Sequence, residues 1–209
     1  MGKQQMSLDL VHDLQAVYRK TIDSMSRPGL ISNITDQADK VNMEISCFGS
    51  TLVLVMMLFD TEVTFKVCSE REEEVSKLIN QLTYAKAKEL ESADFILVLN
   101  DAQPGDLKKA FRRSYAGDLM DPHKAATLII EADYVGNDRA LTLTGPGIET
   151  ECTIDVKTKD GWVDLRAEKT LNIPWELILS LQIGMTIFYV CRELLKLRNR
   201  WLDRWDMLP

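Results

Sequence analysis

The sequence predicts an α/β layered fold, with a mixed sheet flanked by helices. Segments with apolar residues at every third or fourth position alternate with short, continuous apolar runs. The clearest run is FILVL at residues 95–99, which is typical of a strand covered on both faces. A strand-turn-strand pattern over residues 140–156 adds an antiparallel portion. No repeat or linker divides the chain.

The first predicted helix covers residues 8–25. Ser7 is the expected N-cap, because its hydroxyl can accept a hydrogen bond from an amide of the first turn. Pro28 and Gly29 end the helix, and residues 30–40 are polar and expected to be irregular. The apolar positions that define the helix recur three or four residues apart: Val11, Leu14, Tyr18, Ile22 and Met25.

The remaining elements follow from local patterns. Residues 51–59 are apolar throughout, so periodicity alone leaves helix and strand open. A capping box at Ser69–Glu72 predicts a second long helix over residues 70–90, and a short helix is expected from Asp106 to Ser114. Alternation and apolar runs predict strands at residues 63–67, 95–99, 127–131, 140–144 and 151–156.

Composition narrows the class of protein. The chain has 209 residues, of which 45% are hydrophobic, so it can build a sizeable core. Its net charge of −7 argues against a nucleic-acid partner. We see no secretory signal and no apolar run long enough for a membrane helix, so we expect a cytoplasmic protein without a membrane partner. The cysteines form no Cys-x-x-Cys pair and are expected to be reduced: Cys47, Cys68, Cys152 and Cys191.

The glycine-rich segment Thr144-Gly145-Pro146-Gly147 has two readings. Such turns can direct several amides at an anion, which would make it a phosphate-binding loop. The P-loop pattern is absent, however, because no Gly-Lys-Ser/Thr follows and no clear helix begins there. We therefore favour a tight turn that needs glycine at positive φ.

The charged residues and histidines of the sequence give little indication of a binding or catalytic site. Arg19 and Lys20 stand on the first helix and suit a phosphate, a partner subunit or simply solvent. The short helix at residues 106–114 places basic pairs four residues apart, and a solvated face is the ordinary explanation: Lys108, Lys109, Arg112 and Arg113. His12 and His123 have no metal-ligand spacing around them, and no nucleophile elbow is present. We expect no catalytic residue, no metal and no cofactor.

Two motifs carry a family resemblance. Residues 18–29 read YRKTIDSMSRPG, and residues 141–148 read LTLTGPGI. Their order and spacing resemble the H subunit of bacterial carbon–phosphorus lyase, the PhnH family. The resemblance also covers an acidic turn at residues 60–63 and an apolar strand at residues 126–130, and it favours helix for residues 51–59. The motif positions expected to be structural or to form an interface are Tyr18, Arg19, Met25, Ser26, Pro28, Gly29, Thr144, Gly145, Pro146 and Gly147.

The resemblance implies a fold like that of pyridoxal-phosphate-dependent transferases, without their cofactor site. It implies an accessory, non-catalytic subunit of an enzyme complex that forms ribose 1-alkylphosphonate 5-triphosphate from ATP and an alkylphosphonate. The implied partners are the G, I and J subunits, together with the L subunit, and a homodimer when the chain is alone. The competing hypothesis is a stand-alone transferase that uses pyridoxal phosphate.

The resemblance fails after Trp175. Family members continue with a strand like Pro-(Leu/Trp)-Gly-Ile-Asp-Leu-Ile and then Pro-Arg-Thr-Thr, whereas this chain continues with Glu176-Leu177. Loss of one base in a guanine run explains the change, so we interpret residues 1–175 as the family-like domain and residues 176–209 as an aberrant, frameshifted tail. Such a tail should leave a sheet edge unpaired. The alternative is a genuine amphipathic helix from Thr186 to Trp205.

Overall fold

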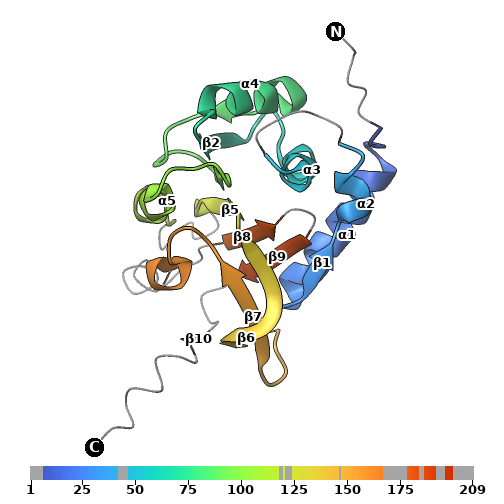
Figure 1. The fold of residues 1–209 in the computed structure, drawn as a ribbon. Helices are drawn as coiled ribbons and strands as arrows, with labels where there is room; N and C mark the ends of the chain where they lie inside the picture. The colour runs from blue at the N-terminus through green and yellow to red at the C-terminus, as the bar shows by residue number, and fades with distance from the viewer. Residues whose placement is uncertain are drawn as a thin grey trace, which may run out of the picture.

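A computed structural model of the chain describes residues 7–41, 47–117, 120, 124–145, 147–166, 178–183, 186–191 and 196–199. Its main sheet has seven strands (Figure 1). In spatial order they are β1 (Ile31–Asn33), β9 (Thr186–Cys191), β8 (Ile178–Ile183), β5 (Thr127–Glu131), β4 (Phe95–Val98), β2 (Thr64–Cys68) and β3 (Lys86–Ala87).

The sheet is mixed, as the sequence predicts. Strands β3, β2, β4, β5 and β8 run parallel, and β9 and β1 then add antiparallel pairings. A second sheet of three antiparallel strands has the order β10 (Lys196–Asn199), β6 (Tyr134–Thr144) and β7 (Cys152–Lys157). The predicted mixed α/β class is therefore confirmed. The likeness to the pyridoxal-phosphate transferase fold stays a prediction.

Helices cover both faces of the main sheet, which gives three layers (Figure 1). On one face lie α1 (His12–Ser26), α2 (Thr35–Ala38), α3 (Gly49–Leu58) and α4 (Glu72–Thr83). The other face is covered by α5 (Asp106–Arg113), a short helix at residues 162–166 and the β6–β7 hairpin. Within the described residues, no helix has both the length and the apolarity needed to cross a bilayer.

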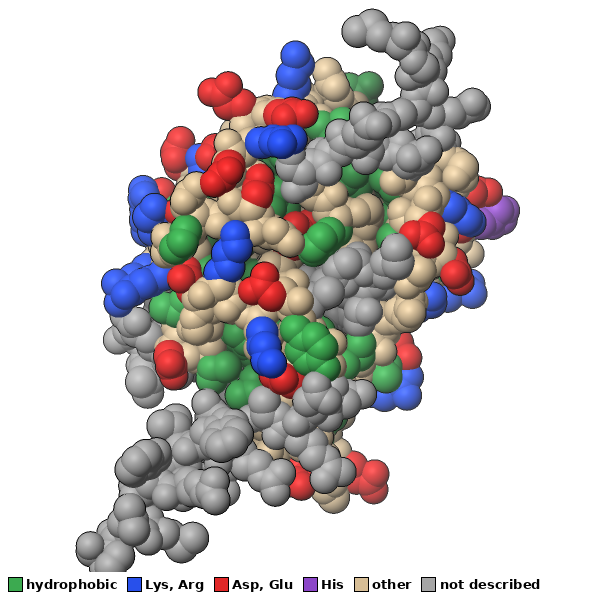
Figure 2. Space-filling model, viewed as in Figure 1, with side chains coloured by type: hydrophobic (Ala, Val, Ile, Leu, Met, Phe, Trp, Pro, Cys, Tyr) green, Lys and Arg blue, Asp and Glu red, His purple; other side chains and the backbone are tan. Residues whose placement is uncertain are grey.

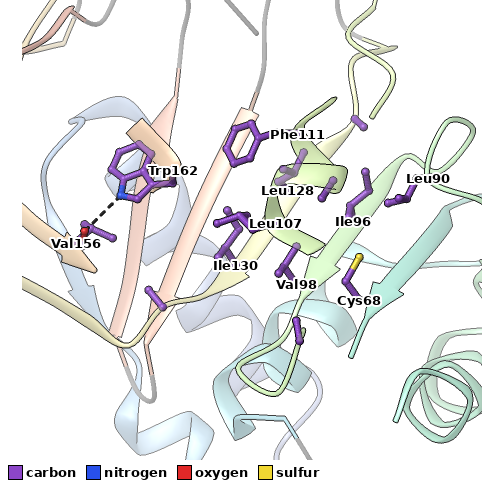
Figure 3. Packing of buried hydrophobic residues seen from close by; sticks show 14 of the residues in the cluster. Cys68, Leu90, Ile96, Val98, Leu107, Phe111, Leu128, Ile130, Val156 and Trp162 are labelled. Atoms are coloured by element: carbon purple, nitrogen blue, oxygen red, sulfur yellow. Dashed lines mark hydrogen bonds between the residues drawn. The ribbon is translucent and has the colours of Figure 1, made fainter. Parts of the chain in front are cut away.

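Alternation along the central strands divides the core in two. Leu97 of β4 and Ile129 of β5 point toward α3 and α4, where they join one buried cluster. Ile96 and Leu128 point the other way, toward Phe111 of α5 (Figure 3). In this second cluster the indole of Trp162 donates a hydrogen bond to the carbonyl of Val156 at 3.4 Å. Burial on both faces explains why these strands are apolar without interruption.

Several predicted boundaries are wrong. Ser7 does not cap α1: its hydroxyl donates to the carbonyl of Lys40, and the Asp9 carboxylate accepts from the first amides of the helix instead. Residues 30–40 are not irregular, because they contain β1 and α2. The helix expected over residues 70–90 ends at Thr83, where Tyr84 adopts a left-handed conformation with φ of 62°. The helix at residues 51–59 is confirmed as α3.

The strands after Trp175 also differ from expectation. Leu179 of β8 pairs in register with Leu128 of β5, so the sheet edge expected to be unpaired is occupied. The alternative helix from Thr186 to Trp205 is wrong where the structure describes it, because β9 and β10 are strands. The residues after Trp175, as given in the sequence, can form strands. Strand pairing therefore does not test the frameshift, which stays a prediction.

Charged side chains of both signs are scattered over the visible face of the molecule (Figure 2). Figure 2 shows acidic and basic groups interspersed over α4, and a basic group of side chains over α5. Much of this charge is paired locally: Lys109 contacts Asp106 at 2.8 Å, and Arg113 contacts Glu91 at 2.5 Å. The basic face predicted on this helix is thus partly neutralised by neighbouring carboxylates.

Candidate functional site

The two family motifs, more than a hundred residues apart in sequence, touch each other. The first ends in the turn after α1, and the second forms the turn between β6 and β7. Gly147 lies so close to the first turn that an added Cβ would stand 2.8 Å from Pro28 Cδ and 2.9 Å from the Ser26 carbonyl oxygen. We call this contact, between the turn at residues 26–29 and Gly147, the motif junction.

A second glycine completes the junction. Gly29 has φ of 94°, a conformation that favours glycine. A Cβ on Gly29 would overlap the Sγ of Cys152 and stand 3.4 Å from Leu143 Cδ1. Cys152 and Leu143 belong to the two strands of the hairpin, so each glycine lets one turn approach the other. Packing therefore explains Gly29 of the first motif and Gly147 of the second.

The turn after α1 is also held from within. The Arg27 guanidinium forms an ion pair with Asp23 one turn earlier, and its Nε donates to Asp23 Oδ1 at 2.9 Å. This carboxylate raises the pKa of Arg27 above its usual range. The Ser26 hydroxyl donates to the Asp23 carbonyl at 2.9 Å, and Leu30 N donates to the Arg27 carbonyl at 3.0 Å. These bonds fix the entry of Pro28 and Gly29 into the junction.

The Gly-Pro-Gly segment is a turn, as favoured from the sequence. Gly145 and Gly147 have φ of 141° and 84°, and Ile148 N donates to the Gly145 carbonyl at 3.1 Å. The turn joins antiparallel strands rather than a strand and a helix. Pro146 lies outside the described residues.

Helix α1 buries its polar side. Ser24 is fully buried, and its hydroxyl lies 2.5 Å from that of Ser32 on β1. Thr21 donates to the Val17 carbonyl, and Asp13 pairs with Lys40 at 2.7 Å. These partners allow hydroxyl and carboxylate groups to be buried without an unmet hydrogen bond.

The opposite side of α1 is apolar and exposed. Tyr18 is 52% exposed, Ile22 46% and Met25 42%, and Val11 just before the helix is 69% exposed. A shallow hollow of about 480 Å³ runs along this side. Its lining includes several first-motif residues: Tyr18, Arg19, Lys20, Ile22, Asp23 and Ser26. The apolar positions that predict the helix are thus largely on its outer face.

The predicted site residues fall into two groups. Tyr18, Arg19 and Met25 lie on the outer face of α1, whereas Pro28 and Gly29 are buried in the junction. Lys20 donates to the Asn33 carbonyl at 2.6 Å, so it fastens the helix to the end of β1. Of the histidines, His12 is exposed at the start of α1, and His123 lies outside the described residues. In the part of the chain that the structure describes, no group of acidic, histidine or cysteine side chains is arranged to hold a metal ion.

One buried acid escaped sequence reasoning. Glu131, the last residue of β5, is only 6% exposed and accepts hydrogen bonds from Phe48 N at 2.8 Å, Asn100 N at 2.9 Å and the Thr51 hydroxyl. Burial raises the pKa of this carboxyl, although the three hydrogen bonds oppose the rise. The one sequence feature that could have indicated this buried acid is a glutamate at the end of an apolar strand. Glu131 joins the start of α3 to the loop after β4.

Cys47 lies beside this carboxylate. Burial, followed by the charges of Glu131 and Asp101, raises the pKa of the Cys47 thiol to about 12. The thiol is therefore protonated at neutral pH and is a poor nucleophile. Its chemistry agrees with the reduced, structural role expected for the cysteines.

The surroundings of Glu131 do not fit pyridoxal phosphate. That cofactor needs a lysine for its Schiff base and an acidic or basic group at the pyridine nitrogen. Glu131 stands at the carboxyl edge of the parallel strands, but its oxygens are engaged by two backbone amides and a threonine. None of these hydrogen bonds comes from a lysine, and the part-buried Lys66 pairs with Glu72 at 2.6 Å on α4.

Comparison with known proteins identifies the family. The sequence model of the family described as bacterial phosphonate metabolism protein (PhnH) matches residues 7–192, which include the whole motif junction. The putative C-P lyase subunit protein HtxG of Stutzerimonas stutzeri is 27% identical over 173 residues, covering 81% of this chain and 78% of that protein. The resemblance noted from the motifs is thereby confirmed: this chain belongs to the PhnH family of bacterial phosphonate metabolism proteins.

Proposed function

We infer that the chain is a cytoplasmic, accessory subunit of the carbon–phosphorus lyase core complex. It would support the reaction of ATP with an alkylphosphonate that releases adenine and forms ribose 1-alkylphosphonate 5-triphosphate. Membership of the family and the likeness to a putative C-P lyase subunit support this assignment. The expected partners are the G, I and J subunits, with the L subunit added for turnover.

The role of the motifs carries the proposal. In an enzyme, the residues that mark a family commonly converge on a concave site with polar groups and shifted pKa values. Here the turn at residues 26–29 and Gly147 pack the junction, whereas Tyr18, Arg19 and Met25 stand on the outer face of α1. An exposed apolar helix face beside a rigid turn suits protein–protein contact better than chemistry.

Reconstitution tests the role. The purified chain is mixed with ATP and methylphosphonate, alone and with the I, G and L subunits, and adenine is measured by chromatography. We expect no adenine from the chain alone and a large fall in adenine release when it is omitted from the mixture. Release by the isolated chain would overturn the accessory role, and a rate unchanged by its omission would overturn any part in this reaction.

A separate measurement tests the alternative hypothesis of a stand-alone transferase that uses pyridoxal phosphate. A purified chain incubated with the cofactor should show no aldimine absorbance band and no retained cofactor after gel filtration. A stoichiometric band that is lost when a single lysine is replaced would favour the stand-alone transferase. Capture of the tagged chain with the G, I and J subunits would separately identify its partners.

A further inference from the structure

Helix α3 begins without a cap from its own sequence. The side chain of its N-cap residue, Phe48, forms no capping hydrogen bond, and its first turn holds no acidic residue. The start of a helix carries unpaired amides and a partial positive charge, which together attract anions. An acceptor for these groups must therefore come from elsewhere in the fold.

The acceptor is a carboxylate of the main sheet. Glu131 stands 83 residues after Phe48, at the carboxyl end of β5. Its Oε1 accepts from Phe48 N at 2.8 Å and from the Thr51 hydroxyl, and its Oε2 accepts from Asn100 N at 2.9 Å. Three donors from two distant segments thus converge on one buried carboxylate. This edge, outside the carboxyl ends of parallel strands, is where α/β folds bind their ligands.

We propose that these three donors form an anion site of carboxylate size, and that Glu131 fills it as an intramolecular ligand. The first turn of α3 supplies two of the donors and the helix dipole, and the loop after β4 supplies the third. Removal of the carboxylate would leave the donors buried and unpaired, which is costly. A small free carboxylate such as formate would then bind in its place. The proposal concerns this site alone and does not depend on the accessory role.

The packing around the site leaves room for a small anion only. Glu131 is 6% exposed and Thr51 is 1% exposed. A Cβ on Gly49, the first residue of α3, would stand 2.6 Å from the Ala38 carbonyl oxygen, so α2 packs tightly against the start of the helix. A phosphate ester with an attached ring would have to displace both this packing and the Glu131 carboxylate. The internal ligand therefore also keeps larger phosphate-bearing ligands out.

A neighbouring charge favours a monoanion. Asp101 follows the donor Asn100, and its Oδ2 accepts from the Ser69 hydroxyl at 2.8 Å. Burial, together with the charge of Asp101, raises the pKa of Glu131, so a second carboxylate acts on the site. Coulomb repulsion by Asp101 is twice as large for a dianion as for a monoanion. Formate is therefore expected to bind better than a phosphate dianion.

The first experiment removes the internal ligand and supplies an external one. Thermal unfolding of Glu131→Ala is followed in sodium formate, with sodium chloride at the same ionic strength as the reference. A dissociation constant on the order of 10 mM would raise the folding equilibrium constant about tenfold at about 100 mM formate. The wild type should show no such gain, because its site is already filled. If Glu131→Ala is unfolded without formate, formate should restore its circular dichroism spectrum.

Two variants control this measurement. Glu131→Gln keeps a side chain of the same size in the site, so formate should have no access and no effect beyond that of chloride. Leu107→Ala creates a cavity under α5, on the other face of the sheet. It is destabilised without losing the carboxylate, so it should respond to formate as the wild type does.

Nuclear magnetic resonance locates the bound anion. In isotope-labelled Glu131→Ala, formate should shift the amide resonances of Phe48 and Asn100, the two backbone donors. These shifts should saturate with the dissociation constant that the unfolding experiment gives. In the wild type the same two resonances should not respond.

The contrary outcomes are equally definite. Equal responses of Glu131→Ala, Leu107→Ala and the wild type to formate, or shifts confined to other amides, would overturn the site. Stronger stabilisation of Glu131→Ala by phosphate than by formate, each relative to the wild type, would overturn its preference for a small monoanion. None of these measurements involves adenine release, so a failure here is distinguishable from a failure of the accessory role.

Discussion

Gly147 and Gly105 share a left-handed backbone but differ in their surroundings. Their φ angles are 84° and 92°, yet a Cβ on Gly105 would meet nothing within 4 Å, whereas one on Gly147 would press on Pro28 and Ser26. Gly105→Ala should therefore lower the free energy of unfolding by about 1 kcal/mol, the cost of the backbone conformation. Gly147→Ala should lower it by about 3 kcal/mol, because overpacking is added. Urea denaturation of both variants measures the difference. Equal losses would mean that the motif junction is not tightly packed.

Glu131 gives the protein a pH dependence of defined sign. Its folded pKa lies above the unfolded value of 4.5, so between these values the folded chain binds more protons than the unfolded chain. The contribution of this carboxyl to stability therefore falls as pH rises from about 4.5 through the folded pKa. The free energy of unfolding of the wild type, minus that of Glu131→Gln, should decline over the same interval.

The matched control for this measurement is Glu73→Gln, which makes the same chemical change on the exposed side of α4. It shows what the same chemical change does to the free energy of unfolding at an exposed position. A difference for Glu131→Gln that is flat, or that rises with pH, would contradict a raised pKa. Chemical denaturation at several pH values provides both curves.

At the scale of the element, α1 shows what periodicity can and cannot determine. The apolar spacing predicts a helix over residues 8–25, and α1 confirms the helix, although it begins at His12 and not at residue 8. The same spacing suggests that the apolar side is buried, but the structure buries Val17, Thr21 and Ser24 instead. The hydroxyls are tolerated because Ser32 and the helix backbone supply partners. Such partners come from other segments, so no local pattern announces them.

Two valines on this helix test the orientation. Val17 is fully buried, whereas Val11 is 69% exposed. Val17→Ala should lower the free energy of unfolding by about 2 kcal/mol through the cavity it leaves, while Val11→Ala should change it by less than about 0.5 kcal/mol. A larger loss for Val11→Ala would reverse the assigned faces of the helix.

The extent of α4 shows a second limit of local reasoning. Its capping box lies near its true start, because Ser69 Oγ accepts from Arg71 N at 3.0 Å. Its end was misplaced because Tyr84, a residue without special turn propensity, takes the left-handed conformation. The buried amide of Ala85 bonds to Thr83, and the Asn80 side chain donates to the Ala85 carbonyl. These contacts end the helix so that β3 can pair beside β2.

For the whole molecule, the strands at residues 95–99 and 127–131 could be predicted because burial on both faces leaves a continuous apolar run. The motif junction could not be predicted as a contact. In the local sequence, each turn indicates only that a helix or a strand ends. The contact between Pro28 and Gly147 arises only from the tertiary fold. Glu131 was missed for a related reason: its hydrogen-bond donors, Phe48, Thr51 and Asn100, are distant in sequence.

The segment after Trp175 completes both sheets, through β8 beside β5 and β10 beside β6. In the family pattern the same place follows a Trp-Gly-Ile sequence and begins a strand. Backbone pairing requires strand-forming residues rather than particular side chains, so either reading frame can supply a neighbour for β5. The fold therefore does not distinguish the two reading frames. Only the nucleotide sequence of the gene can show which one is correct.

We expect the gene to carry four guanines where the written sequence implies three. The codons TGG GGA ATT give Trp-Gly-Ile, and loss of one guanine gives TGG GAA TT, which reads Trp-Glu-Leu as at residues 175–177. In the restored frame, Arg192 to Leu195 fall where Pro-Arg-Thr-Thr can be read, which recovers the family's arginine. Resequencing across the Trp175 codon and measuring the intact mass of the expressed chain decide the matter. Three guanines, together with a mass equal to the 23.8 kDa of the written sequence, would show that the tail is translated as written.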